Sequence, residues 1–483
     1  MDSISVKEIL EATAGRLLRG EPSQLTRSFS TDTRTLRPGD LFIPLKGKRF
    51  DGHDFLPEAF AKGAIGTLLS DPEKIPSSPF ALLIQVEDTL TALGEIARLW
   101  RRKFPIPVVA VTGSNGKTTT KEMIRSILAQ DRRVLASRGS LNNLVGLPLT
   151  LLALSPFHEA AVLELGMNAL GEIRRLSEIA QPDVGVITNI GEAHLEFLGS
   201  LEGVAQAKGE LLPFLEGDRP LRGHPGVLKS EPGGRMEKVA ILNLDDPYCN
   251  GLLPQVRGRL LTFGLNKKAD LWAGGVQLRK GGGTAFVLYR GEEAVPVELP
   301  AMGYHNVYNA LAAAAVGSVF DLPLQRIAEG LKRTSLAPMR FERRRLASGA
   351  VLINDAYNAN PTSMQASIET FFQVKEGRRA ILVLGDMLEL GEASTEAHLR
   401  LGRFVARFNP DLLITVGQES ERIGEGAVAS GLPAGKVRHV KDRAEAKALL
   451  VGAMGPSPLL SEETWVLVKA SRAMHLEEVI EGL

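Results

Sequence analysis

The sequence has a single cysteine, almost no net charge and no long apolar run, and each absence excludes a class of protein. Cys249 alone cannot form an internal disulfide, which fits a reducing compartment. The 57 basic and 56 acidic residues nearly cancel, so neither a nucleic-acid-binding surface nor an acidic tail is indicated. The longest apolar runs, such as "ALAAAAVGSVF", are shorter than the roughly 20 residues that a membrane span needs.

The N-terminal "MDSISVKEIL" also lacks the basic segment and apolar block of an export signal. With a hydrophobic content of 44%, these absences predict an ordinary cytoplasmic protein with no membrane span and no nucleic-acid partner. The 483 residues exceed what one hydrophobic core holds, so two to four domains are expected. The sequence does not fix the oligomeric state, and we expect a monomer.

The order of apolar segments predicts an α/β protein with three domains. Residues 1–105 open with apolar side chains at helical spacing over 5–19 and continue with short strand candidates, "DLFIPL", "IGTLLS" and "ALLIQV". This part is expected to be a small α/β domain. In residues 106–335, strand-like runs such as "VVAVTG", "AAVLELG", "VGVITNI" and "VAILNL" alternate with helical stretches, which is typical of a doubly wound parallel sheet.

Other segments complete this pattern. Residues 220–236 are rich in glycine and proline and are expected to form an exposed loop, and "AFVLYRGEEAVPVEL" alternates like a β-hairpin. Helices are expected at about 305–320 and 324–334, followed by a hinge at "SLAPMRFE". Residues 336–483 repeat the alternation of strands and helices, so a C-terminal Rossmann-like α/β domain is predicted.

The stretch "VVAVTGSNGKTTTKEMI" predicts a phosphate-binding loop of unusual spacing. Gly113 and Gly116 are three positions apart, and the place of the usual first glycine holds Val111. A strand, a glycine turn and a helix starting near Lys117 would aim backbone N–H groups at an anion. Lys117 suits the β- and γ-phosphates, and the Thr118 hydroxyl suits Mg²⁺. The alternative is a turn that merely favours Gly and Asn, but Gly-Lys-Thr at this structural position favours a nucleotide.

Further polar residues follow neighbouring strands. Glu164 ends "AAVLELG" and His194 lies just past "VGVITNI", at the strand ends where open α/β sheets bind ligands. A carboxylate there can hold a cation that bridges ATP phosphates. Taken singly, a Glu or His at such a position is more often a solvated or capping side chain. Their common position at one sheet edge favours the site.

Lys208 stands inside an apolar helical stripe with Leu201, Val204 and Leu212 in "SLEGVAQAKGELLPFL". One explanation is that its ammonium reaches water along a packed stem. The other is that the amine is modified or paired inside a site.

Two more segments group polar residues at helix starts. "GYHNVYNALAAAA" would place an amide near an adenine edge, although helix capping explains it as well. "INDAYNANPTSM" would line a strand-end cleft or simply form a capped loop. The residues concerned are His305, Asn306 and Asn309 in the first segment and Asp355, Tyr357, Asn358 and Asn360 in the second.

These motifs together resemble the Mur ligase family, the ATP-dependent amide-forming enzymes that build the peptidoglycan stem peptide. The segments that carry the resemblance, in order from about residue 27 to 475, are "TGSNGKTT", "ELGMN", "TNIGEAHLEFLGS", "AKGELL", "HNVYNALAA" and "RFE". The short glycine spacing is that family's form of the loop. "STDTR", "GDLFIPLKG" and "DGHDF" at the front, with "NDAYNANPTSM" and "LGDMLELG" at the back, are similar to the member that joins D-alanyl-D-alanine to UDP-N-acetylmuramoyl-tripeptide.

The resemblance implies a set of site residues. For ATP these are Gly113, Ser114, Asn115, Gly116, Lys117, Thr118, Thr119, Asn309, Arg340 and Asp355. Two Mg²⁺ ions would be held by Thr118, Glu164, His194 and a CO₂-derived carbamate on Lys208, and Lys117, His194 and Lys208 would be catalytic. The UDP-sugar substrate would meet Ser30, Asp32, Arg34 and Lys46, with one of Asn142 and Asn143 on the substrate side. The acceptor would meet Tyr357, Asn358, Ser471 and Arg472.

The implied reaction runs through an acyl phosphate. It would serve peptidoglycan synthesis and hence cell shape and division. Two alternative functions remain. A tripeptide-forming Mur enzyme or a folylpolyglutamate synthase would share the ATP site, but "DAYNANP" argues against both. A nucleotide-gated binding module without catalysis would not need the second metal site. The third residue of the accepted peptide, lysine or diaminopimelate, stays open. One departure concerns the family turn "KGSR", which here has Ala470 for glycine; if the turn needs positive φ, this costs about 1 kcal/mol.

Overall fold

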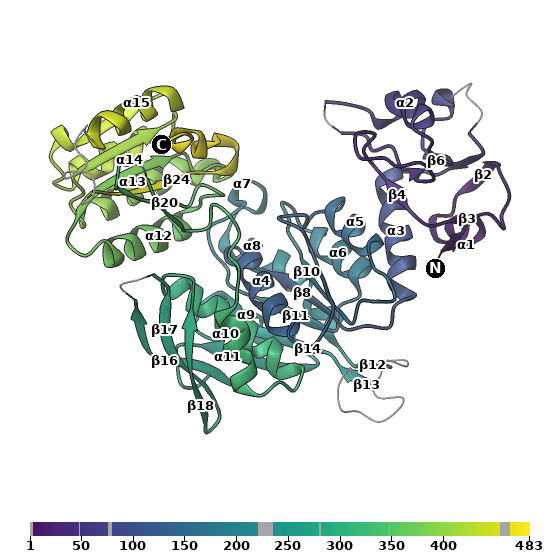
Figure 1. The fold of residues 1–483 in the computed structure, drawn as a ribbon, viewed down its shortest axis with the longest axis horizontal. Coiled ribbons are helices and arrows are strands. Elements are labelled where there is room, and N and C mark those ends of the chain that lie inside the picture. Colours follow the sequence, from purple (N-terminus) through teal and green to yellow (C-terminus); the bar gives the residue numbers. More distant parts are fainter. Residues whose placement is uncertain are drawn as a thin grey trace.

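A computed structural model describes residues 3–47, 49–75, 80–220, 235–279, 282–346, 348–454 and 464–483 (Figure 1). Each predicted domain carries one main sheet, and the three-domain α/β fold is confirmed. In Figure 1 the N-terminal domain (purple) and the C-terminal domain (yellow-green) lie on opposite sides of the central domain. Residues 221–234 of the predicted loop lie outside the described residues. Among the helices that are described, none has the length and apolarity to cross a bilayer.

The N-terminal domain has a five-stranded sheet in the order β2-β7-β6-β5-β4. The strands are β2 (Arg16–Arg19), β4 (Phe29–Ser30), β5 (Leu41–Phe42), β6 (Gly66–Leu69) and β7 (Leu82–Gln85). The prediction of one helix over 5–19 is wrong in its second half. Helix α1 (Val6–Thr13) ends because Ala14 adopts a left-handed φ of 49°. Leu17 then enters β2 and pairs with Ile84, so its apolar side chain packs on a sheet instead of extending the helix.

The central domain is a doubly wound sheet of nine strands in the order β18-β17-β16-β15-β14-β11-β8-β10-β9. The strands are β8 (Val108–Thr112), β9 (Val134–Ala136), β10 (Ala160–Glu164), β11 (Val184–Ile187), β14 (Val239–Asn243), β15 (Arg259–Gly264), β16 (Leu271–Leu278), β17 (Thr284–Arg290) and β18 (Glu293–Leu299). Pairing is parallel from β9 to β16, and β17 and β18 form the predicted antiparallel hairpin.

Alternate side chains of β8 belong to two cores, as expected for a strand covered on both faces. Val108 and Ala110 pack with α3 (Thr89–Arg102), α5 (Gly146–Leu152), α6 (Glu172–Ala180) and α8 (Leu201–Gly209). Val109 and Val111 pack with α4 (Lys117–Leu128), α10 (Tyr304–Val319) and α11 (Leu324–Lys332). The first core continues into the N-terminal domain through α3, whereas the C-terminal domain has cores of its own.

The C-terminal domain has a six-stranded sheet in the order β19-β20-β24-β21-β22-β23, parallel except at β19. Its elements are β19 (Glu342–Arg345), β20 (Val351–Asn354), α12 (Pro361–Val374), β21 (Arg379–Gly385), α13 (Ser394–Ala406), β22 (Leu412–Val416), α14 (Glu421–Ala429), β23 (Val437–Val440), α15 (Arg443–Met454) and β24 (Thr464–Lys469). The predicted alternation of strands and helices is present, and β19 is an antiparallel edge strand.

Candidate active site

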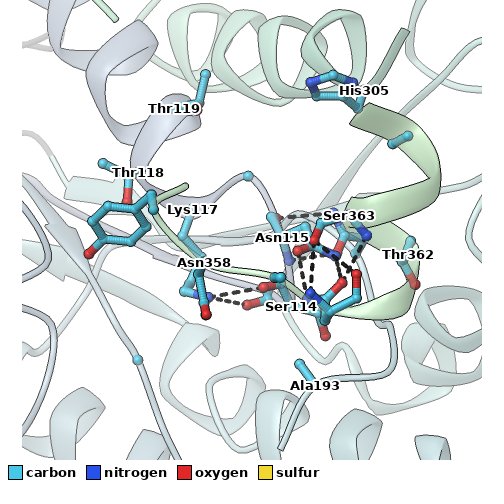
Figure 2. A pocket seen from close by; sticks show the side chains of 18 of the residues that line it. Ser114, Asn115, Lys117, Thr118, Thr119, Ala193, His305, Asn358, Thr362 and Ser363 are labelled. Atoms are coloured by element: carbon cyan, nitrogen blue, oxygen red, sulfur yellow. Dashed lines mark hydrogen bonds between the residues drawn. The ribbon is translucent and has the colours of Figure 1, made fainter. Parts of the chain in front are cut away.

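A cavity of about 940 Å³ lies where the carboxyl ends of β8, β10 and β11 face the C-terminal domain (Figure 2). It is the strand-end location that the sequence predicts. All the predicted site residues line it except Asn143 and the four residues of the front motif. The predicted residues therefore share one cavity, although they make up fewer than half of its lining.

The loop from β8 to α4 needs both of its glycines. Gly113 has a φ of 146° and Gly116 a φ of 82°, which disfavour any side chain. A Cβ at Gly113 would lie 1.9 Å from Thr188 Oγ1, and one at Gly116 would lie 2.1 Å from Asn309 Oδ1. Conformation and space therefore both explain glycine at these two positions.

The end of the neighbouring strand β11 fixes the loop. The Thr188 hydroxyl donates to Asn115 O at 2.6 Å, and the Asn115 N–H donates to Asn189 Oδ1 at 2.9 Å. The Ser114 hydroxyl exchanges hydrogen bonds with the backbone of Gly191. The sequence analysis missed Thr188 and Asn189, although both stand in the quoted segment "TNIGEAHLEF". Thr and Asn are common in the turns that follow strands, so the sequence alone does not indicate that these two residues support the loop.

Lys117 lies over its own loop. Its Nζ donates to the carbonyl oxygens of Gly113 at 2.7 Å and Ser114 at 3.3 Å. Burial lowers the pKa of Lys117, the charge of Arg340 lowers it further, and Glu164 opposes the shift. Two cations therefore face the loop, which suits a polyanionic ligand.

Glu164 is buried between two donors. The Thr118 hydroxyl donates to its Oε2 at 2.9 Å, and Asn142 Nδ2 donates to its Oε1 at 2.8 Å. Asn143 instead accepts from the backbone N–H groups of Val145 and Gly146 at the start of α5. The structure thus answers which asparagine reaches the site: Asn142 does, and Asn143 supports a helix.

His194 lies at the domain boundary. Its φ of 58° is left-handed, and its Nδ1 lies 2.7 Å from Oε2 of Glu389 in the C-terminal domain. This contact is the largest cause of a lowered pKa for the Glu389 carboxyl. The ring therefore reaches the cavity next to a carboxylate that the sequence analysis had only quoted within "LGDMLELG".

Lys208 is buried in α8, with a side chain that is 2% exposed. The explanation that its ammonium reaches water is wrong. Burial, with the nearby charge of Lys117 as a lesser cause, holds the pKa of Lys208 well below its ordinary value. The predicted stripe is shorter than expected, because α8 ends at Gly209 and Leu212 belongs to a separate 3₁₀ turn.

The first turns of α10 do not use their amides as caps, because Gly303 is the N-cap. Asn309 is buried: its Oδ1 accepts from the Thr120 hydroxyl at 3.3 Å, and its Nδ2 donates to Asn306 Oδ1 at 3.0 Å. The Asn309 amide thus packs against the phosphate loop at Gly116, and its contact with adenine stays a prediction. Burial lowers the pKa of His305 to about 4.

The hinge brings Arg340 to the central domain. Its Nη2 lies 3.3 Å from Thr118 Oγ1, to which it donates, and its guanidinium lies over the ring of Tyr357. Asp355 accepts from the Phe341 N–H at 3.0 Å and pairs with Lys469 Nζ at 2.7 Å. The sequence analysis considered only the turn that follows Lys469. It did not predict the ion pair of Lys469 with Asp355, because the two residues are far apart in the chain.

A second link joins the phosphate loop to α12. Asn115 and Asn360 exchange side-chain amide hydrogen bonds of 3.3 and 2.9 Å, and Asn360 also caps α12 by accepting from the Ser363 N–H. Figure 2 shows Asn115 next to Ser363, which lies in the first turn of that helix.

The C-terminal turn does not require positive φ at Ala470, which is absent from the left-handed residues of the described chain. The expected strain is therefore wrong. The Ala470 methyl is fully buried and faces Gly385, where an added Cβ would lie 2.7 Å away. Ser471 accepts from the Leu388 N–H at 2.9 Å, so the turn is well placed beside the cavity.

The front motif lies apart, in the N-terminal domain. Asp32 forms a two-pronged hydrogen-bonded pair with Arg34, and the Ser30 hydroxyl donates to Asp32 O. Lys46 forms an isolated β-bridge with Asp51. All four residues lie in the N-terminal domain and outside the cavity, and their contact with the UDP-sugar substrate stays a prediction.

The fold and this geometry can be compared with known proteins. Three family models match, described as "Mur ligase family, catalytic domain" over residues 27–101, "Mur ligase middle domain" over 111–317 and "Mur ligase, glutamate ligase domain" over 339–472. The UDP-N-acetylmuramoyl-tripeptide–D-alanyl-D-alanine ligase of Bacillus subtilis (strain 168) is 38% identical, covering 99% of this chain and 98% of its own.

Two solved structures are also similar over nearly the whole chain. MurF from Acinetobacter baumannii superposes with a TM-score of 0.85 at 32% identity, covering 99% of this chain and 98% of its own. MurF ligase from Thermotoga maritima, solved in complex with ADP, has a TM-score of 0.78 at 30% identity and covers 94% and 96%.

Proposed function

The chain belongs to the Mur ligase family, and from that membership we propose that it is the ATP-dependent ligase that joins D-alanyl-D-alanine to UDP-N-acetylmuramoyl-tripeptide. The observation that carries the proposal is the cavity between the central and C-terminal domains, which is lined by residues 113–119 together with Glu164 and Arg340. The product would be the pentapeptide precursor of peptidoglycan, and so would serve cell-wall growth, cell shape and division.

A magnesium ion fits the pair Thr118 and Glu164, because hydroxyl and carboxylate oxygens that already lie 2.9 Å apart are hard ligands. When bound there, Mg²⁺ would offset charge on the ATP phosphates. We propose a second ion near His194 and Lys208. A carbamate on Lys208 would add an anionic oxygen ligand to this region, where the Glu389 carboxylate already lies 2.7 Å from His194 Nδ1.

The chain's own residues then bind and orient ATP. The loop from Gly113 to Thr119 would present backbone N–H groups to the phosphates at the start of α4. Lys117 would move from the loop carbonyls to the β- and γ-phosphates, and Arg340 would approach them from the hinge. With Lys117 and Arg340 in place, the repulsion between the γ-phosphate and the substrate carboxylate would fall. The carboxylate oxygen would then attack phosphorus as the bond to ADP breaks.

The acceptor completes the reaction from the C-terminal side. The free amine of D-alanyl-D-alanine would attack the acyl carbon and lose a proton, and phosphate would leave from the tetrahedral intermediate. Asn358, Ser471 and Arg472 line this side of the cavity and would hold the dipeptide. Closure of the two domains would exclude water from the acyl phosphate. Ser30, Asp32, Arg34 and Lys46 would hold the UDP part on the N-terminal domain.

We propose that the reaction takes place in the cytoplasm, because the chain has a single cysteine and uses ATP. We also propose a monomer, because one chain supplies the whole cavity wall described. The test follows an oxygen atom. Tripeptide precursor labelled with ¹⁸O in its terminal carboxylate is incubated with ATP, Mg²⁺ and D-alanyl-D-alanine. An acyl phosphate transfers one label to inorganic phosphate, and mass spectrometry detects both the label and the pentapeptide. Phosphate that carries no label, or no pentapeptide, would refute the proposal.

A further inference from the structure

We propose that Tyr357 is a positioning residue for ATP, whose ring holds the Arg340 guanidinium in the plane that meets the phosphates. The inference rests on the proposed function, since it assigns Arg340 to the nucleotide. It also differs from the role that the resemblance implies for Tyr357, which is contact with the acceptor dipeptide.

The first observation is the stack itself. Arg340 Cζ lies 3.8 Å from the centroid of the Tyr357 ring, well inside the range of a cation–π contact. Arg340 Nε is buried without an acceptor among the described residues. Asp355, which could have paired with an arginine, is already bound to Lys469 Nζ at 2.7 Å. Apart from one hydrogen bond of 3.3 Å to Thr118, the ring is therefore the contact that sets the guanidinium plane.

The second observation is the backbone around the stack. Met339 has a φ of 58° and Phe341 a φ of 55°, so Arg340 stands between two left-handed residues that are not glycine. Such conformations persist only where the surroundings fix them. Here the Tyr357 N–H donates to Met339 O at 3.3 Å, and the Phe341 N–H donates to Asp355 Oδ1 at 3.0 Å. Segments 339–341 and 355–357 thus form one unit that presents Arg340.

The third observation is where this unit points. Arg340 reaches Thr118 at the start of α4, and both line the same cavity as Lys117. A guanidinium forms paired hydrogen bonds to phosphate oxygens only in its own plane, so fixing that plane fixes the direction of binding. The ring face that lies against Arg340 is not available to a dipeptide.

The ring and the hydroxyl of Tyr357 can be separated by mutation. Within the described part of the chain the hydroxyl makes no hydrogen bond, so Tyr357→Phe should keep the stack and lose nothing that the stack needs. Tyr357→Leu keeps a branched apolar side chain but removes the π face. If instead the hydroxyl holds the acceptor, Tyr357→Phe should be the damaging change.

The experiment uses the full chain and measures two things: the affinity of AMP-PNP with Mg²⁺ by calorimetry, and KM for D-alanyl-D-alanine by initial rates. We expect Tyr357→Phe to match wild type and Tyr357→Leu to bind AMP-PNP about tenfold more weakly, with KM for the dipeptide changed less than twofold. Arg340→Lys, which cannot stack as a plane, should lose a similar factor, and the double variant should lose little more than the worse single variant. Tyr304→Leu, an exposed tyrosine on α10, is the matched control.

Wild-type AMP-PNP affinity in Tyr357→Leu, with or without a raised KM for the dipeptide, overturns the inference. So does an equal loss in Tyr357→Phe. Thermal unfolding checks each variant, and if Tyr357→Leu is unstable, Tyr357→Met, which also lacks a ring, serves in its place and must bind AMP-PNP more weakly than wild type does. A wild-type chain that neither binds AMP-PNP nor consumes ATP refutes the proposed function itself, and the inference with it.

Discussion

Asn142 and Asn143 are neighbours in the sequence with different partners in the structure. Asn142 holds a carboxylate oxygen of buried Glu164, and Asn143 satisfies backbone N–H groups at the start of α5. Asn142→Ala should therefore lower the catalytic rate about tenfold, because it removes a hydrogen bond to a charged, buried acceptor. Asn143→Ala should lower the free energy of unfolding by about 1 kcal/mol and leave the rate nearly unchanged.

Initial rates over a range of Mg²⁺ concentrations, with thermal unfolding of both variants, check this pair. Each variant is the control for the other, since the chemical change is the same. The assignment fails if the two asparagines give the same profile.

Lys208 carries a second prediction at this scale. A buried lysine beside the charge of Lys117 is poorly placed to remain an ammonium, and its long stem gives a carbamate a reach that glutamate lacks. Lys208→Ala should lose most activity, formate or acetate should restore part of it, and Lys208→Glu should substitute poorly. Independently of turnover, ¹³C-bicarbonate NMR should show a carbamate carbon in wild type that Lys208→Ala lacks. Its absence from active enzyme would contradict the modification.

Single residues also mark the limit of sequence reasoning. The polar types at strand ends identified Glu164 and His194 as candidates, because strand order alone brings such positions to one edge. Lys208 was identified by its place inside an apolar helical stripe. The sequence could not show that Glu389 would lie against His194, because the two residues are far apart in the chain. For the same reason it could not show that the Asn309 amide would accept a hydrogen bond from the Thr120 hydroxyl. Periodicity reports which face a residue occupies, and long-range packing decides what it touches.

Among the elements, the loop from β8 to α4 is the one whose residues are most narrowly determined by backbone conformation and space. Gly116→Ala adds a Cβ that would lie 2.1 Å from Asn309 Oδ1, at a φ of 82°. We expect a loss of about 100-fold in kcat/KM for ATP, because the loop must shift by an ångström or so. Gly171→Ala is the control: its φ of 88° is similar, but nothing lies within 4 Å of the added atom. If crowding is the cause, Asn309→Ala should recover part of the Gly116→Ala loss and Gly171→Ala should retain activity; equal losses at both glycines would point to backbone strain alone.

The pair of strands β21 and β24 carries a prediction about stability. The methyl of Ala470 fills the space above Gly385, so the glycine that the family turn usually has is not needed here. Ala470→Gly should lower the free energy of unfolding by about 1 kcal/mol through a lost buried methyl and a freer unfolded chain. Gly385→Ala should lower the free energy of unfolding more when Ala470 is present than in the Ala470→Gly variant. A double-mutant cycle of chemical denaturation measures this difference. Stabilisation by Ala470→Gly would mean that the turn is strained after all.

At this scale the sequence predicted strands better than helix ends. Continuous apolar runs located the buried strands of both large sheets, because a strand covered on both faces must be apolar throughout. The first helix was extended too far, since Leu17 keeps the helical spacing while the backbone turns at Ala14. A left-handed alanine leaves no trace in a hydrophobic pattern.

In the whole molecule, the two outer domains are attached to the central one in different ways. The N-terminal domain shares a continuous apolar core with it through α3. The central domain adds Met302 and Leu195 to one core of the C-terminal domain, and the two domains also meet through polar links, including Asn115 with Asn360 and Arg400 with Glu192. Polar contacts exchange readily with water, whereas separating a shared core exposes apolar surface. The C-terminal domain is therefore the part expected to move.

The last prediction tests which contact holds this arrangement. Asn360→Ala removes both amide hydrogen bonds to Asn115 as well as the cap of α12, while Asn360→Asp keeps a capping oxygen and one acceptor. Small-angle X-ray scattering without ligand should give a larger radius of gyration for Asn360→Ala than for wild type. Asn360→Asp should lie between them. Arg400→Ala, which breaks only a solvent-exposed ion pair, should stay close to wild type because such pairs contribute little. AMP-PNP with the UDP substrate should bring Asn360→Ala back toward the compact curve, since ligand atoms would then bridge the two domains. Scattering curves that coincide for all four proteins would show that the amide pair does not hold the domains together.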